Sequence, residues 1–141
     1  MIFKILKKRA GPRHLRTGEW GETIAEKYLK KKKYTLIGRR IRVKRRDELD
    51  LVMRSPDGVL VFVEVKTRKN EDFGRPVSAV NRRKQEILSR AAWAYMKDLK
   101  DKPNHFRFDV VEVVGSIERG DPEVRHIENA FVMAGNRRIN W

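Results

Sequence analysis

Three residues that could do chemistry together lie in two strand-like runs of the sequence. Asp50 is in the run 48–53, and Glu64 and Lys66 are in the run 59–66, whose other residues are apolar. Because successive side chains of a strand point to opposite faces, Glu64 and Lys66 share one face. The turn sequence Ser-Pro-Asp-Gly separates the runs and predicts an antiparallel hairpin. Two carboxylates and an ammonium group on one side of a sheet would suit a divalent metal ion and an activated water beside a phosphodiester.

Each of these groups has a distinct part in such a reaction. Asp50 and Glu64 would bind the metal ion directly, and the main-chain carbonyl of Val65 is a natural third ligand. Mg²⁺ is the expected ion, with Mn²⁺ as an alternative. Lys66 would orient or deprotonate the attacking water and stabilise the developing negative charge. Glu48 lies on the same face as Asp50 and is an alternative acid that could exchange roles with it.

Each feature also has a simpler explanation when it is taken alone. A glutamate and a lysine two residues apart on a strand often form only a surface ion pair, which contributes about 0–1 kcal/mol. Two acids with one residue between them are common before a strand as well. The hairpin spacing, the apolar strand around Glu64 and the basic composition together favour a nuclease-type site.

The composition is strongly basic. Among 141 residues, 34 are Lys or Arg and 19 are Asp or Glu, which gives a formal net charge of +15. Such a charge favours a polyanionic partner, of which nucleic acid is the commonest. The alternative is that the charge only keeps the protein soluble. The length allows one domain with a real core.

Several function classes are disfavoured by what the sequence lacks. There are no cysteines, so disulfide frameworks and thiolate zinc sites are excluded. The three histidines, His14, His105 and His126, form no spaced pair and are interpreted as ordinary surface or core residues. No apolar run approaches the roughly 20 residues that span a bilayer. The expected location is the cytoplasm, with no membrane partner.

A helix and a strand are expected before the hairpin. Residues 1–16 are basic and are interpreted as a mobile arm, which either adds electrostatic contacts to nucleic acid or is a frayed end. Thr17 is the predicted N-cap of a helix over residues 17–32, whose apolar residues recur with i, i+4 spacing. Glu22 falls at the margin of that apolar stripe, where it could bind a second metal ion or a metal-bound water. A first strand is expected over residues 34–43.

A second helix and two further strands complete one domain. Residues 67–76 are expected to form a loop, and Ser78 is the predicted N-cap of a helix that reaches about residue 99. Strands are expected over residues 106–114 and 124–133. The predicted organisation is a basic arm, a single nuclease-like domain and a basic tail, over residues 1–16, 17–134 and 135–141.

Four basic residues are candidates for contacts with nucleic acid. Arg45 and Arg46 lead into the hairpin, and Arg68 lies at the end of the strand that carries Glu64. Lys84 extends the inner stripe of the second helix toward its start. A lysine in that position needs an acidic or phosphate partner, or else its ammonium group reaches back to solvent.

The same residues match a known family pattern. The segments 18–22, 48–52 and 62–68 resemble the YraN family of small bacterial proteins. That family is similar to the restriction-endonuclease-like superfamily with the PD-(D/E)xK signature, and most of all to the archaeal Holliday junction resolvases. The resemblance covers roughly residues 15–115.

The resemblance implies an α/β fold with an α-β-β-β-α-β core, in which helices flank a mixed central sheet. It also implies that Glu22, Asp50, Glu64 and Lys66 hold the catalytic roles, with the three acids as metal ligands. Family members usually have glycine before the Glu-x-Asp run, where this chain has Asp47. An extra acid there could tune metal binding or accommodate a different turn.

The leading hypothesis is a magnesium-dependent DNA endonuclease that acts on branched or otherwise non-standard duplexes. The preference for branches rests on the analogy with resolvases. Resolvases act as symmetric dimers because two opposed strands must be cut, so a homodimer is expected by the same analogy. The alternative is a nucleic-acid-binding protein that does not cut. An RNA-binding protein attached to translation is a third and less favoured hypothesis.

Overall fold

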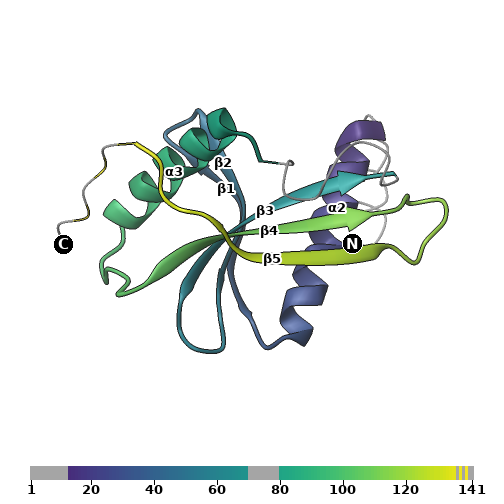
Figure 1. Cartoon of the computed structure of the whole chain (residues 1–141), viewed down its shortest axis with the longest axis horizontal. Helices are drawn as coiled ribbons and strands as arrows, with labels where there is room; N and C mark the ends of the chain where they lie inside the picture. The colour runs from purple at the N-terminus through teal and green to yellow at the C-terminus, as the bar shows by residue number, and fades with distance from the viewer. Residues whose placement is uncertain (1–12, 70–79, 136, 138, 140–141) are drawn as a thin grey trace, which may run out of the picture.

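The predicted strands form one five-stranded mixed sheet, and a helix packs against each of its faces (Figure 1). The computed structural model describes residues 13–69, 80–135, 137 and 139. The elements in chain order are α2 (Arg13–Lys31), β1 (Thr35–Val43), β2 (Asp47–Arg54), β3 (Leu60–Arg68), α3 (Arg82–Lys97), β4 (Phe106–Val114) and β5 (Glu123–Phe131). This order confirms the α/β class and the α-β-β-β-α-β core, to which the predicted last strand is added.

The strands stand in the sheet in the order in which the sequence presents them. β1 pairs with β2, and β2 with β3, in the antiparallel sense, which confirms the predicted hairpin. β4 joins β3 in parallel because α3 carries the chain back to the start of the sheet, and β5 returns antiparallel to β4. β3 is therefore the central strand, paired on both edges.

Alternating side chains of β3 separate two hydrophobic cores. Leu60 and Phe62 pack on one face with buried residues of α3. Val61 and Val63 pack on the other face with buried residues of α2. No charged residue enters β3 before Glu64, so the change from apolar to charged side chains marks the border between the core and the candidate site.

The helix starts differ from the predicted ones. α2 already begins at Arg13, so Thr17 lies inside the helix and is not its N-cap. The residues just before Thr17 are His, Leu and Arg, which a helix tolerates, so nothing stops the helix there. α3 is capped by Asn81, whose side-chain oxygen accepts a hydrogen bond from the N–H of Lys84 at 2.9 Å. The predicted cap, Ser78, lies outside the described residues.

Parts of the predicted arm and tail also lie outside the described residues, namely residues 1–12, 136, 138, 140 and 141. Residues 13–16, the last of the predicted arm, form the first turn of α2. Among the described residues, no helix combines the length and the apolar character that crossing a membrane requires.

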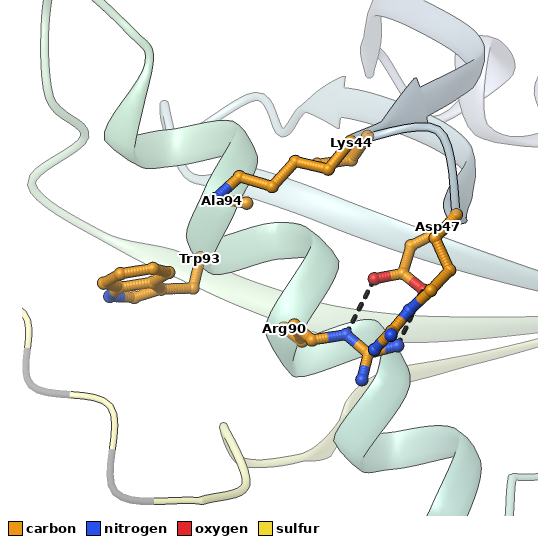
Figure 2. Close-up of a pocket in the computed structure, with 7 residues that line it drawn as sticks. Lys44, Asp47, Arg90, Trp93 and Ala94 are labelled. Atoms are coloured by element: carbon orange, nitrogen blue, oxygen red, sulfur yellow. Dashed lines mark hydrogen bonds and ion pairs between the residues drawn. The ribbon is translucent and has the colours of Figure 1, made fainter.

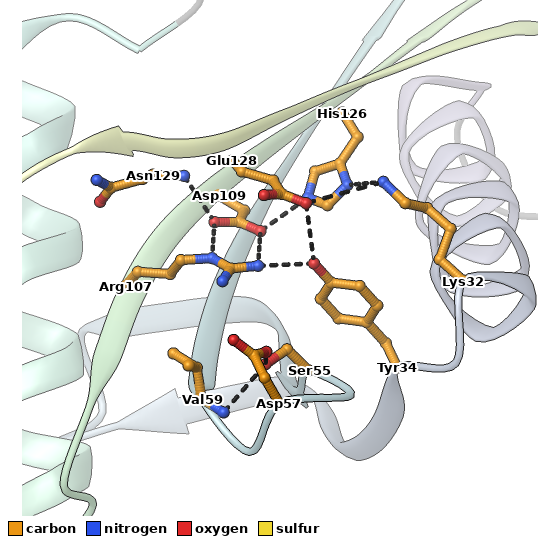
Figure 3. Close-up of polar contacts among 10 residues, drawn as sticks. All are labelled: Lys32, Tyr34, Ser55, Asp57, Val59, Arg107, Asp109, His126, Glu128 and Asn129. Carbon is orange, nitrogen blue, oxygen red and sulfur yellow. Dashed lines mark hydrogen bonds and ion pairs between the residues drawn. The ribbon is translucent and has the colours of Figure 1, made fainter.

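A buried polar cluster ties β4 and β5 to the end of α2 (Figure 3). Asp109 is fully buried, and its carboxylate accepts hydrogen bonds from Arg107 Nε at 2.9 Å and from His126 Nε2 at 2.7 Å. The main-chain N–H of Asn129 donates a third, at 2.9 Å. Lys32 Nζ, which can only donate, lies 2.8 Å from His126 Nδ1, on the side of the ring away from Asp109. Burial alone would raise the pKa of Asp109, but these donors lower it.

The surroundings of two glycines of α2 show how closely this helix packs on the sheet. A Cβ on Gly21 would lie 1.9 Å from Oγ1 and 3.1 Å from Cβ of Thr67, whereas nothing lies within 4 Å of a Cβ on Gly18. Gly18→Ala is expected to raise the free energy of unfolding by about 0.5–1 kcal/mol through helix propensity. Gly21→Ala is expected to lower it by about 1–3 kcal/mol, because α2 must move away from β3. Urea denaturation measures both values, and equal stabilisation by the two changes would contradict the close contact.

Candidate active site

Glu64 and Lys66 continue the face of β3 that packs against α3. Leu60 and Phe62 precede them on this face and lie inside the core. Glu64 is still buried, with 5% of its surface exposed, whereas the side chain of Lys66 is 32% exposed. The charged pair therefore stands where the core ends and solvent begins.

Asp50 reaches β3 because the pairing between β2 and β3 ends early. The antiparallel register stops at Leu51↔Val63, which leaves the N–H of Val65 without a partner in the β2 ladder. Asp50 Oδ2 accepts a hydrogen bond from that N–H at 2.9 Å. The carboxylate replaces the missing ladder bond, and this fixes it within hydrogen-bonding reach of the Glu64 carboxylate.

Two lysine ammonium groups lie against Glu64. Glu64 Oε2 is 3.4 Å from Lys66 Nζ and 3.6 Å from Lys84 Nζ. Lys84 comes from the first turn of α3, so the inward lysine has the acidic partner that its position requires. Both lysine side chains remain about one-third exposed, at 32% and 37%, and can also reach a group that arrives from solvent.

Asp50 has no cationic partner within the part of the chain that the structure describes. Burial and the neighbouring charge of Glu64 raise the pKa of Asp50 to about 8, although the hydrogen bond from Val65 acts in the opposite direction. The more distant charge of Glu22 adds to the rise. Near neutral pH, Asp50 therefore keeps a proton that a bound cation would displace.

The donor set fits a hard divalent cation. Asp50 and Glu64 offer carboxylate oxygens, and the carbonyl of Val65 points to the same edge of β3 as its N–H, toward Asp50. Mg²⁺ needs only one or two carboxylates, because waters and phosphate oxygens complete its coordination. The described residues contain no group of three His, Cys, Asp or Glu that could hold a metal ion together. A site here would use two carboxylates.

Arg40 engages Glu22, the third predicted acid. Arg40 Nε donates to Glu22 Oε1 at 2.8 Å, and Arg40 Nη1 donates to Glu19 Oε1, also at 2.8 Å. The backbone of Arg40, within β1, is left-handed, with φ 49°. Glu22 acts on Asp50 through its charge, and Arg40 already occupies Oε1 of Glu22.

The two acids that precede Asp50 have other partners. Glu48 is 44% exposed and lies 3.9 Å from Arg42. Asp47 is buried and accepts two hydrogen bonds of 2.8 Å from Arg90 of α3, which lower its pKa. The extra acid at position 47 therefore clamps the β1–β2 hairpin to α3.

A groove of about 740 Å³ leads to Asp50 between the β1–β2 hairpin and α3. Its cationic lining comprises Arg46, Arg83, Lys84 and Arg90. Arg46 and Lys84 are among the predicted contacts, whereas Arg83 and Arg90 are additional. Their i, i+7 spacing on α3 places them on one face of the helix, and that spacing is the sequence signal that identifies them.

The two other predicted basic residues do not line this groove. Arg45 is exposed at the β1–β2 turn. Arg68 lies at the end of β3 on the face of Glu64 and Lys66, and its carbonyl accepts a hydrogen bond from the N–H of Gly115 at 2.7 Å. Arg45 and Arg68 stay candidates for contacts outside the groove.

Comparison with known proteins finds relatives of the same size. The model of "Uncharacterised protein family UPF0102" matches residues 21–113, which include Asp50, Glu64 and Lys66. A UPF0102 protein of Syntrophomonas wolfei is 43% identical over 114 residues, which cover 81% of this chain and 96% of the relative. A UPF0102 protein of Geotalea uraniireducens is 45% identical over 120 residues, which cover 83% and 90%. No solved structure matches the chain.

The raised pKa of Asp50 predicts how stability depends on pH. The folded protein keeps a proton that the unfolded chain loses near pH 4, so this group makes the protein less stable as the pH rises from about 4 to about 8. Asp50→Asn keeps an acceptor for the N–H of Val65 and removes the charge. It is expected to raise the free energy of unfolding by about 1–3 kcal/mol at pH 8 and by much less near pH 5.

Urea denaturation at the two pH values measures this difference. Glu48→Gln, an exposed change on the same strand, is the control and is expected to alter either value by less than about 0.5 kcal/mol. A gain from Asp50→Asn that does not depend on pH would show that Asp50 is ionised throughout.

Proposed function

The chain belongs to the uncharacterised protein family UPF0102, and we propose that it is a metal-dependent endonuclease that cleaves phosphodiester bonds in DNA. The membership confirms the resemblance to the YraN family. The observation that carries the proposal is the contact between two acids, Asp50 and Glu64, beside the ammonium group of Lys66. Two carboxylates pressed together at the edge of the core repel each other once ionised, and a divalent cation between them removes that penalty.

Each residue has a defined part in the proposed hydrolysis. Asp50, Glu64 and the carbonyl of Val65 would hold Mg²⁺ or Mn²⁺, which supplies Lewis-acid stabilisation of phosphate charge and a more acidic water. Lys66 orients or deprotonates the attacking water and stabilises negative charge on the phosphate. Lys84 approaches the same Glu64 oxygen from α3 and is placed to bind a phosphate oxygen there.

The charge distribution supports nucleic acid as the substrate. The net charge is +15, and four cationic side chains line the groove that leads to Asp50, beside the four acidic side chains of Asp47, Glu48, Asp50 and Glu86. Phosphate contacts of this kind supply most of the sequence-independent affinity for DNA. Branched DNA as the preferred form, and a homodimer as the active state, follow from the analogy with resolvases alone.

A nucleic-acid-binding protein that does not cut is the second candidate function. The specific observation in its favour is the engagement of Glu22 by Arg40, which leaves two carboxylates at the site among the described residues. The contact between Asp50 and Glu64 argues against this candidate, because a binding surface alone does not require it. The two candidates differ in whether any product forms when Mg²⁺ is added.

Cleavage of a four-way junction and of a plain duplex, with and without Mg²⁺, tests the endonuclease. The wild-type protein is expected to cut only with Mg²⁺. Glu64→Ala and Lys66→Ala are each expected to lower the rate by about 10²–10⁴-fold, because each removes a group that acts on the reacting phosphate or water. Glu48→Gln is the matched control and is expected to retain the rate. Cleavage that survives both alanine substitutions would remove this assignment of the site.

The groove gives a second prediction, which concerns binding. Arg46→Gln combined with Arg83→Gln is expected to make the dependence of DNA affinity on salt less steep by about 1–2 in the logarithmic slope. Lys27→Gln, an exposed change on α2 beyond the opposite face of the sheet, is the control. Fluorescence anisotropy with a labelled duplex across a salt series measures the slopes. An unchanged slope in the double variant would show that DNA does not follow the groove.

A further inference from the structure

A second hollow opens beside the groove, between the tip of the β1–β2 hairpin and the middle of α3 (Figure 2). Its volume is about 250 Å³. The hairpin supplies Val43, Lys44, Arg46 and Asp47 to its lining, and α3 supplies Arg90, Trp93 and Ala94. We call this hollow the Trp93 pocket. It lies outside the site formed by Asp50 and Glu64.

The Trp93 pocket combines an apolar floor with an aromatic wall. Val43 and Ala94 are buried, with 8% and 5% of their surfaces exposed. Lys97 Nζ lies over the indole of Trp93, 4.6 Å from the ring centroid, in a cation–π contact. The indole Nε1 has no hydrogen-bond partner among the described residues, so packing and Lys97 hold the ring and no hydrogen bond fixes its tilt. An indole ring offers a flat ligand a surface on which to stack.

The rim of the Trp93 pocket is cationic. Lys44 and Arg46 come from the hairpin tip, and Arg90 comes from α3 and is held by Asp47 through two hydrogen bonds of 2.8 Å. Three cations face one carboxylate, so the rim keeps an excess of positive charge. A ligand that suits both rim and wall has an aromatic ring and an anionic group, which describes a nucleotide.

The hairpin tip holds one of these cations, Lys44, at a cost in backbone energy. Lys44 and Arg45 both have positive φ, at 50° and 66°, in a turn closed by the N–H of Arg46 and the carbonyl of Val43. Turns of this kind strongly favour Asn-Gly, because most side chains are strained in the left-handed region. Basic residues at both strained positions point to a need for positive charge at the tip.

The Trp93 pocket and the groove lie side by side. Arg46, Asp47 and Arg90 line both, and the groove reaches Asp50. A DNA strand with its phosphates in the groove would therefore pass the mouth of the pocket. The pocket is smaller than the about 300–1,000 Å³ typical of small-molecule sites, so one base fits and a base pair does not.

We propose that the Trp93 pocket binds one unpaired nucleobase of a DNA strand that lies in the groove. This inference rests on the proposed function in one respect, because it takes DNA as the substrate. It then specifies the form of DNA: the protein selects duplexes that contain an unpaired nucleotide, and the base stacks on Trp93 while its phosphates meet Arg46 and Arg90. Flaps and bulges offer such a base, whereas a fully paired four-way junction offers one only where pairing opens at its branch point.

Binding in EDTA tests the pocket without any cleavage. A labelled duplex and the same duplex with one unpaired thymidine are titrated by anisotropy. The wild-type protein is expected to bind the bulged duplex about 5- to 100-fold more tightly, the usual range for one base stacked on an aromatic ring. Trp93→Leu is expected to lose this preference and to keep the affinity for the plain duplex, whereas Trp93→Phe is expected to retain most of it. Unfolding midpoints confirm that each variant is folded.

Tryptophan fluorescence gives an independent measurement. In a Trp20→Phe, Trp141→Phe background, Trp93 is the sole tryptophan, since the sequence contains three. The bulged duplex is expected to quench this emission and the plain duplex to leave it nearly unchanged. Equal quenching by both, or an equal affinity of the wild-type protein for both, would overturn the inference.

The outcomes separate the pocket from the nuclease. In one outcome, the wild-type protein prefers the bulged duplex, Trp93→Leu loses this preference, and nothing is cleaved with Mg²⁺. This result would support base binding in the Trp93 pocket and reject the endonuclease. Mg²⁺-dependent cleavage without any preference for the bulge would overturn the pocket and uphold the endonuclease. A wild-type protein that binds neither DNA would overturn the pocket as well.

Discussion

The site depends on one hydrogen bond, from the N–H of Val65 to Asp50. β3 is the central strand, and an unpaired main-chain N–H on the edge that faces β2 would cost free energy of folding. The β2 ladder stops at Leu51↔Val63, so a carboxylate side chain takes the place of the next backbone acceptor. That substitution brings Asp50 against Glu64. The repulsion between the two acids is thus a consequence of how the sheet ends.

A second contact, between Asp47 and Arg90, determines the shape of the surroundings. It joins the start of β2 to the middle of α3, so both walls of the groove and of the Trp93 pocket are fixed relative to each other. Glycine at position 47, as the YraN pattern has it, could not make this contact. The clamp also orients Arg90 without removing the charge excess of the rim. Asp47, where the pattern has glycine, therefore contributes more directly to the groove and the Trp93 pocket than to the proposed metal site.

The sequence predicted those parts of the structure that follow from period-2 alternation and from local turn signals. Glu64 and Lys66 share a face because no irregularity interrupts β3. The engagement of Glu22 by Arg40 was not predictable, because it depends on a left-handed residue within β1. The predicted cap of α3 was Ser78 and the observed cap is Asn81, and residue preference does not decide between them because Ser and Asn cap about equally well. The groove depends on where α3 lies across the hairpin, and helical spacing alone does not give that position.

The charges around Asp50 and Glu64 indicate which interactions at the site a bound cation would change. Two ammonium groups already lie against Glu64, and the raised pKa of Asp50 keeps one proton on the pair of acids near neutral pH. A divalent cation would therefore displace that proton and leave both lysines in place. Lys66 and Lys84 would stay beside Glu64 and, with 32% and 37% of their side chains exposed, could also contact an anionic ligand. In this way, the site would accommodate a metal ion and a phosphate at the same time.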